Sequence, residues 1–203
     1  MFLMEEDIAN ALAALRKGAI ILYPTDAVWG IGADATNPAA VARIYEVKGR
    51  PTDHPLIVHI ADFKYLEQWI SDIPEYAIAL AREYWPGPMT LILLRSELAK
   101  DFITGGQNTV GIRIPNNMIA LGLLDAFHKL GGAGMAAPSA NRFGQVSPTS
   151  SGDVEEELGA YLSFFDLVLD GGLCQIGIES TIIDCLDKTP KILRPGFISK
   201  EVS

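Results

Sequence analysis

Apolar residues recur at helical spacing near the start of the chain and then form a short continuous run. Ile8, Leu12 and Leu15 lie on one face of a helix over residues 5–17, which begins with acids, ends with bases and is followed by a glycine. Residues 19–23 are all aliphatic or aromatic, as in a strand that is buried in a protein interior. The start of the chain therefore predicts an amphipathic helix followed by a buried strand.

Helical and strand patterns alternate along the rest of the chain. Helices are predicted at about residues 37–47, 62–70, 74–84, 117–130 and 153–158, and strands at about 56–60, 89–94, 109–114, 133–137, 167–169, 180–185 and 192–193. Continuous apolar strands mixed with amphipathic helices predict an α/β fold in which helices cover the sheet. Because no repeat, low-complexity tract or linker-like stretch interrupts the pattern, we expect one domain over residues 1–203.

The composition is that of an ordinary globular protein, with 49% hydrophobic and 20% charged residues. The formal net charge is −9, from 25 acids against 16 bases, whereas a general nucleic-acid binder usually has a basic excess. An anionic ligand must therefore be bound by a few well-placed cations. No apolar run approaches the roughly 18 to 20 residues of a membrane helix, and acids follow the first four residues, unlike in a secretory signal. We expect a cytoplasmic protein that does not contact a membrane.

The cysteines and histidines do not indicate a metal centre built by the protein alone. Cys174 and Cys185 are too few for a zinc site or a disulfide framework. The three histidines, His54, His59 and His128, are few and scattered. Any metal is therefore expected to arrive with a nucleotide.

Three arginines, Arg50, Arg113 and Arg194, are followed by a proline either directly or after one residue. Proline fixes its own φ and keeps the preceding residue extended, so each guanidinium can be presented from stiff backbone. A guanidinium is well suited to bidentate contact with a phosphate or a carboxylate. Taken singly, however, each arginine is more often a surface residue beside a turn.

Lys48 and Arg50 flank Gly49 just after a predicted helix, so two cations and bare backbone could contact a polyphosphate. The segment is not a glycine-rich phosphate loop with a terminal Lys-Ser or Lys-Thr. By composition alone it is also typical of a solvated helix end.

Hydroxyl and amide groups gather in the segments 137–141, 147–149 and 179–181, where they could bind a ligand or form ordinary turns. Ser139 lacks the Gly-x-Ser-x-Gly setting of a hydrolase nucleophile. His59 lies in an apolar strand and is typical of a satisfied interior histidine. Local patterns alone thus indicate an α/β domain with several candidate anion sites.

Nine motifs follow one another along the chain, and their order is more specific than any one of them. They are Tyr-Pro-Thr-Asp-Ala-Val-Trp-Gly-Ile-Gly at 23–32, Lys-Gly-Arg-Pro at 48–51, Pro-Leu-Ile-Val-His-Ile at 55–60, Trp-Pro-Gly-Pro-Met-Thr at 85–90, Thr-Val-Gly-Ile-Arg-Ile-Pro at 109–115, Ala-Pro-Ser-Ala-Asn at 137–141, Ser-Pro-Thr at 147–149, Glu-Ser-Thr-Ile at 179–182 and Arg-Pro-Gly at 194–196. Together they resemble the YrdC-like family of threonylcarbamoyl-AMP synthases, over about residues 5–200.

This resemblance implies a twisted, mostly parallel or mixed sheet that is flanked by helices and encloses a large concave cavity. It also implies a nucleotidyl transfer. The amine of L-threonine captures bicarbonate as a carbamate, and a carbamate oxygen attacks the α-phosphate of ATP, bound with Mg²⁺, to release pyrophosphate. The threonylcarbamoyl-AMP product passes to proteins that modify transfer RNA, and weak contact with the tRNA itself is a further expectation.

The resemblance assigns roles to ten positions of this sequence. The catalytic positions are Lys48 and Arg50, which hold the triphosphate; the other ATP-binding positions are His54, Thr109, Ser139, Ser147 and Arg194; the threonine-binding positions are His59, Arg113 and Ser180. The Arg113 guanidinium is the natural partner for the threonine carboxylate. Such chemistry needs positioning and charge neutralisation but no side-chain nucleophile.

Three positions depart from the commonest family pattern. Ala27 replaces a threonine, His54 replaces an asparagine, and Trp29 replaces another aromatic residue. The extra C-terminal domain of longer members is expected to be absent. Two alternatives stay open: a divergent paralogue without the synthase activity, and an RNA-binding module.

Overall fold

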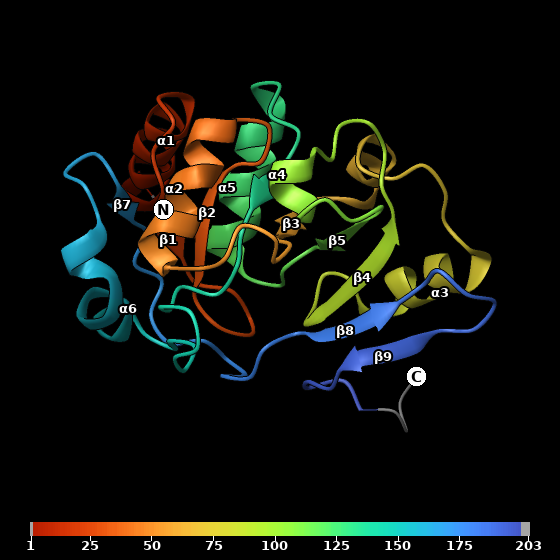
Figure 1. The fold of residues 1–203 in the computed structure, drawn as a ribbon. Helices are drawn as coiled ribbons and strands as arrows, with labels where there is room; N and C mark the ends of the chain where they lie inside the picture. The colour runs from red at the N-terminus through yellow and green to blue at the C-terminus, as the bar shows by residue number, and fades with distance from the viewer. Residues whose placement is uncertain (1, 200–203) are drawn as a thin grey trace.

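The computed structural model describes residues 2–199, and its strands form one nine-stranded sheet in the order β7-β1-β2-β6-β3-β5-β4-β8-β9 (Figure 1). The strands are β1 (Ile21–Tyr23), β2 (Gly30–Asp34), β3 (Ile57–His59), β4 (Met89–Leu94), β5 (Thr109–Arg113), β6 (Met135–Ala136), β7 (Leu167–Val168), β8 (Thr181–Asp184) and β9 (Lys191–Arg194). The pairs β1–β7, β3–β5 and β4–β8 are parallel, and the other five pairs are antiparallel. The sheet is therefore mixed.

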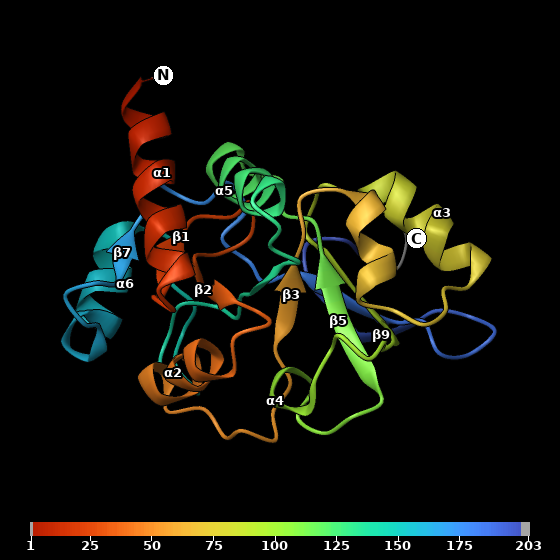
Figure 2. The ribbon, with the colours of Figure 1, turned by 90° about the horizontal axis from the view of Figure 1, so that it is seen from above.

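Helices lie on both sides of this sheet. They are α1 (Phe2–Arg16), α2 (Pro38–Lys48), α3 (Glu75–Tyr84), α4 (Asp101–Thr104), α5 (Met118–Lys129) and α6 (Ser151–Leu158), with 3₁₀ helices η1 (Phe63–Gln68) and η2 (Gly159–Tyr161). Figure 2 shows α1 and α5 together on one side of the strands, and α2 and α4 on the other. None of the described helices is long and apolar enough to span a membrane.

Strand β1 shows why the apolar run in this part of the sequence is continuous. Leu22 packs in the larger core cluster, which includes the buried face of α2. Its neighbours Ile21 and Tyr23 point to the opposite face, into a second cluster with α1 and α5. Since successive side chains of a strand alternate between faces, a strand covered on both sides must be apolar at every position.

Most predicted elements are confirmed to within a few residues, and one is corrected in type. Residues 62–70 contain a 3₁₀ helix, not an α-helix, over Phe63–Gln68. The short helix α4, the 3₁₀ helix η2 and the strand β2 were not predicted. Strand β2 contains two glycines, which are typical of turns. A Cβ atom at Gly32 would lie 2.7 Å from side-chain atoms of both Met135 and Tyr23, so tight packing explains that glycine.

Candidate functional site

Residues from distant parts of the sequence line one cavity of about 260 Å³, close to the lower end of typical ligand pockets. Its polar lining comprises Thr25, Arg50, His59, Arg113, Ser139, Asn141, Gln145, Glu179, Ser180 and Arg194. Trp29 and Phe143 add aromatic surface. Three arginines and one glutamate give this lining a fixed charge of +2, in a chain whose net charge is −9. The cavity is thus a local anion site in an acidic protein.

A tight turn between β1 and β2 forms one wall of the cavity. The Thr25 hydroxyl donates to the Val28 carbonyl at 2.6 Å and accepts from the backbone N–H groups of Ala27 and Val28 at 3.1 and 3.2 Å. The hydroxyl therefore stabilises the turn, and its hydrogen is already donated to a backbone carbonyl of the protein. This turn places Asp26 next to the end of β5.

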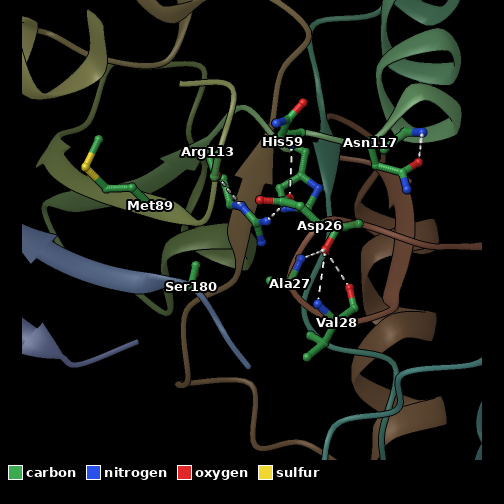
Figure 3. Close-up of polar contacts among 12 residues, drawn as sticks. Asp26, Ala27, Val28, His59, Met89, Arg113, Asn117 and Ser180 are labelled. Carbon is green, nitrogen blue, oxygen red and sulfur yellow. Dashed lines mark hydrogen bonds and ion pairs between the residues drawn. The ribbon is translucent and has the colours of Figure 1, made fainter. Parts of the chain in front are cut away.

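Arg113 and Asp26 form a buried ion pair at that point, and Figure 3 shows their side chains pointing toward each other, with His59 beside them. Arg113 Nε also donates to the Gly87 carbonyl at 3.0 Å, and Asp26 Oδ1 accepts the Asn116 N–H at 3.0 Å. Burial lowers the pKa of Arg113, and Asp26 acts against that change. Within the described residues the Nη1 group of Arg113 has no hydrogen-bond partner, so it can donate to a ligand.

His59 lies at the end of β3, where it is 3% exposed and lines the cavity. Its Nδ1 atom is 3.0 Å from the Tyr23 hydroxyl. Burial, and then the nearby Arg113 charge, lower the pKa of His59 well below its usual range. The imidazole is therefore neutral at physiological pH.

Arg194 connects the segment before β8 to the end of β9. Its Nε and Nη2 atoms donate to the Ser180 carbonyl at 3.1 and 2.9 Å, and Nη2 also donates to the Ser180 hydroxyl at 3.1 Å. Nη1 binds the Glu179 carboxylate, which also accepts the Ser147 hydroxyl at 2.6 Å. The Ser180 hydroxyl is further 2.9 Å from that of Thr90. This network fixes Ser180 at the cavity wall.

Lys48 is 1% exposed and does not line the cavity. Its Nζ atom donates to the carbonyls of Ser139 and Asn141 at 2.5 and 2.6 Å. Arg50 lies on the cavity side, where it donates to the Pro55 carbonyl at 2.9 Å and lies over the Phe143 ring. The two cations of the Lys-Gly-Arg-Pro segment therefore face different surroundings.

Residues 13–196 match the family model Sua5_yciO_yrdC, which is described as telomere recombination. The chain belongs to this family. The Pyrococcus abyssi threonylcarbamoyl-AMP synthase is 45% identical over 97% of this chain and 56% of its own length, and the Bacillus subtilis protein of the same name is 43% identical over 97% and 55%. A crystal structure of P. abyssi Sua5 complexed with L-threonine superposes with a TM-score of 0.89 at 44% identity, over 96% of this chain and 55% of that one. The chain thus spans about half the length of these relatives.

The structure of this Sua5/YciO/YrdC member brings six of the ten expected site residues together. Those that line the cavity are Arg50, His59, Arg113, Ser139, Ser180 and Arg194. Those outside the lining are Lys48, His54, Thr109 and Ser147. Three of these four still touch a residue of the wall: Lys48 through Ser139, Ser147 through Glu179, and exposed His54 through an edge-on contact with Phe143 at 5.2 Å. Half-buried Thr109 lies at the start of β5, with its hydroxyl 3.5 Å from Gln107 Oε1.

Sequence reasoning did not identify the residues that hold the site residues in place. The sequence around Tyr23 indicates only a buried strand, and no pattern in the sequence connects the Glu179 carboxylate with Arg194. A carboxylate in a loop, such as that of Asp26, is more often solvated than buried against an arginine. The unusual residue Ala27 is buried and lies outside the cavity lining, whereas Trp29 lines the cavity, as the aromatic character of that position indicates.

Proposed function

We propose that this chain synthesises threonylcarbamoyl-AMP and pyrophosphate from L-threonine, bicarbonate and ATP. The observation that supports this most directly is the convergence of Arg50, Arg113 and Arg194 on one cavity beside the neutral imidazole of His59. Two anionic reactants, an amino-acid carboxylate and a triphosphate, require such a group of guanidinium donors. The names of its relatives agree with this chemistry.

Burial divides the cavity into two parts that suit reactants of different size. His59, Arg113 and Ser180 are each less than 5% exposed, whereas Arg50 and Arg194 are only half-buried. A small amino acid fits the enclosed part, with its carboxylate at Arg113. A nucleotide fits the open part, with its phosphates at Arg50 and Arg194 and with Ser139 beside it. Lys48 supports this part by holding the Ser139 segment.

The proposed reaction needs no side-chain nucleophile. The threonine amine attacks bicarbonate to give a carbamate and water, and a carbamate oxygen then forms a bond to the α-phosphorus of ATP while the bond to pyrophosphate breaks. Guanidinium groups aimed at the developing charge, and the fixed placement of both reactants, supply the catalysis.

Magnesium is proposed to enter as part of the ATP complex. Among the described residues, no group of three or more His, Cys, Asp or Glu side chains could hold a metal ion. The carboxylate in the cavity lining, Glu179, already binds Arg194 and Ser147. The cavity therefore suits a magnesium ion that is held by the phosphate oxygens of ATP and that neutralises part of their charge. We further propose that the product is used in the cytoplasm by proteins that modify tRNA.

The decisive test is pyrophosphate release by the purified protein with ATP, Mg²⁺, threonine and bicarbonate, each omitted in turn. The proposal requires release to depend on both threonine and bicarbonate. Release without that dependence would point to a divergent paralogue. Salt-sensitive retention of tRNA without turnover would favour an RNA-binding module.

Two substitutions test the division of the cavity. Arg50→Ala should chiefly raise the KM for ATP, and Arg113→Ala should chiefly raise the KM for threonine. Arg82→Ala, in an exposed position on α3, is the control and should change neither. Equal effects of the first two variants on both substrates would refute the assignment.

A further inference from the structure

The Tyr23 side chain crosses the neighbouring strand β2 to reach His59. In the sheet, β2 and β6 lie between β1, which ends at Tyr23, and β3, which ends at His59. The Tyr23 ring lies over the two glycines of β2: a Cβ atom would come within 3.7 Å of it at Gly30 and within 2.7 Å at Gly32. The ring meets the imidazole edge-on, with its hydroxyl 3.0 Å from Nδ1. The packing of β2 therefore leaves room for this one contact.

The hydrogen-bond donors available here determine which nitrogen of His59 carries the proton. A neutral imidazole has one donor and one acceptor, and burial raises the pKa of Tyr23, which keeps its phenol protonated. Tyr23 is fully buried, and within residues 2–199 the hydrogen-bond partner of its hydroxyl is Nδ1 of His59. If Nδ1 carried the proton, the phenol hydrogen would be buried without an acceptor, which is unfavourable. Tyr23 therefore donates to Nδ1, and the imidazole proton is on Nε2.

The Nε2 atom has no hydrogen-bond partner in the described part of the chain, although His59 lines the cavity. Its N–H is thus directed at whatever occupies the enclosed part, beside the Nη1 group of Arg113. We propose that Tyr23 is a positioning residue that fixes His59 as an Nε2–H donor, so that this part of the cavity selects an amino acid through an oxygen acceptor. The choice of threonine as that amino acid rests on the proposed function.

The tautomer can be measured directly by long-range ¹H–¹⁵N NMR of protein labelled with ¹⁵N-histidine. The chain has three histidines, and loss of one signal in His59→Gln assigns His59. The wild type should show Nε2 protonated and Nδ1 unprotonated, and Tyr23→Phe should give a mixture of tautomers. The control is Tyr45→Phe, because the Tyr45 hydroxyl donates to the His54 carbonyl and not to His59; its His59 signals should match the wild type.

Calorimetry then connects the tautomer to the ligand. Tyr23→Phe should weaken threonine binding roughly 2- to 10-fold, the worth of about one hydrogen bond, and should change ATP binding less than about twofold. An Nδ1-protonated His59 in the wild type would overturn the proposal, even if the variant fails to fold. A changed tautomer with unchanged threonine affinity would overturn the role of Nε2–H in recognition. The expected wild-type tautomer without any threonine binding would refute the proposed function and leave the tautomer assignment standing.

Discussion

Lys48 Nζ donates a hydrogen bond of 2.5 Å to the backbone carbonyl of Ser139, a residue 91 positions further along the chain. A second bond of 2.6 Å joins the same ammonium group to the Asn141 carbonyl. Together they fasten the segment that follows β6 to the last residue of α2. Burial, and then the nearby Arg50 charge, lower the pKa of Lys48 to about 7. A neutral amine still has two N–H groups for the two carbonyls.

Because of this lowered pKa, Lys48 should make stability rise with pH. The ordinary pKa is 10.5, so between about pH 7 and 10.5 the unfolded chain binds a proton that the folded chain has lost, and the free energy of unfolding increases with pH. Below about pH 7 both states are protonated and the burial of the charge is fully unfavourable. Lys48→Met should abolish the contribution of Lys48 to this rise in stability, as measured by urea unfolding from pH 7 to 9.

The matched control is Lys17→Met, because Lys17 is exposed at the end of α1. It should keep the wild-type dependence on pH. If the free energies of unfolding of the wild type and of Lys48→Met changed in parallel from pH 7 to 9, Lys48 would not have a lowered pKa in the folded protein.

Asp26→Asn should destabilise the fold strongly, because it leaves the Arg113 charge buried without its partner. The two side chains are 3% and 5% exposed, and removal of one member of such a pair costs about 3 to 5 kcal/mol. The amide keeps an acceptor for the Asn116 N–H, but Asp26 Oδ2 is buried without a partner in the described residues, so an NH₂ group there would have no acceptor.

Urea unfolding of Asp26→Asn should be compared with that of Asp101→Asn. Asp101 is 77% exposed in its pair with Arg95, so its loss should cost less than about 1 kcal/mol. Similar losses in the two variants would show that the Asp26–Arg113 pair does not act as a buried one.

Arg194→Lys should impair the use of threonine, although it retains the positive charge. The guanidinium makes three hydrogen bonds to Ser180, from Nε and Nη2, and a lysine cannot reproduce this fork. Steady-state pyrophosphate release should show the KM for threonine raised about 3- to 10-fold, the worth of one or two hydrogen bonds. Lys191→Ala, at the exposed start of β9, should leave that KM unchanged. An effect of Arg194→Lys on the ATP KM alone would argue against a role in placing Ser180.

The sequence indicated that each of three arginines could bind an anion, but it did not indicate that they line one cavity. Proline after Arg50, Arg113 and Arg194 indicated stiff anion sites, but periodicity contains no information on strand order. The three come together because β5 lies between β3 and β4, and β8 and β9 follow at the edge. From the sequence, only the family resemblance, which rests on the order of the motifs, predicts that the three arginines share one site.

The residues that support the site could not be predicted from the sequence for a different reason. A lysine at a helix end is normally solvated, so nothing in the sequence shows that Lys48 points inward to two carbonyls. The sequence predicted a satisfied interior histidine at His59; the residue is buried, but its Nε2 atom has no hydrogen-bond partner among the described residues. The partner of Nδ1, Tyr23, is 36 residues away, and glycines of an unpredicted strand make room for the contact. Such pairings depend on tertiary packing.

Gly49→Ala should destabilise the protein through both the backbone and a side-chain contact. Gly49 ends α2 with φ +61° and ψ +31°, in the left-handed region, where a residue with a Cβ atom costs roughly 1 to 2 kcal/mol. An added Cβ would also lie 2.6 Å from Arg142 Nη2, on a guanidinium whose Nη1 donates to the Val47 carbonyl at 2.7 Å.

A double-mutant cycle separates these two causes by urea unfolding. In an Arg142→Ala background, Gly49→Ala should destabilise the protein only by the cost of the left-handed backbone. The free energies of unfolding should therefore show a coupling of about 0.5 kcal/mol or more between the two substitutions. Gly152→Ala is the control: Gly152 lies in α6, a Cβ there meets only Ser150 Oγ at 3.8 Å, and the substitution should stabilise by about 0.4 to 1 kcal/mol. If Gly49→Ala were as harmless as Gly152→Ala, the turn between Lys48 and Arg50 would not require its left-handed glycine, and the different surroundings of the two cations would need another cause.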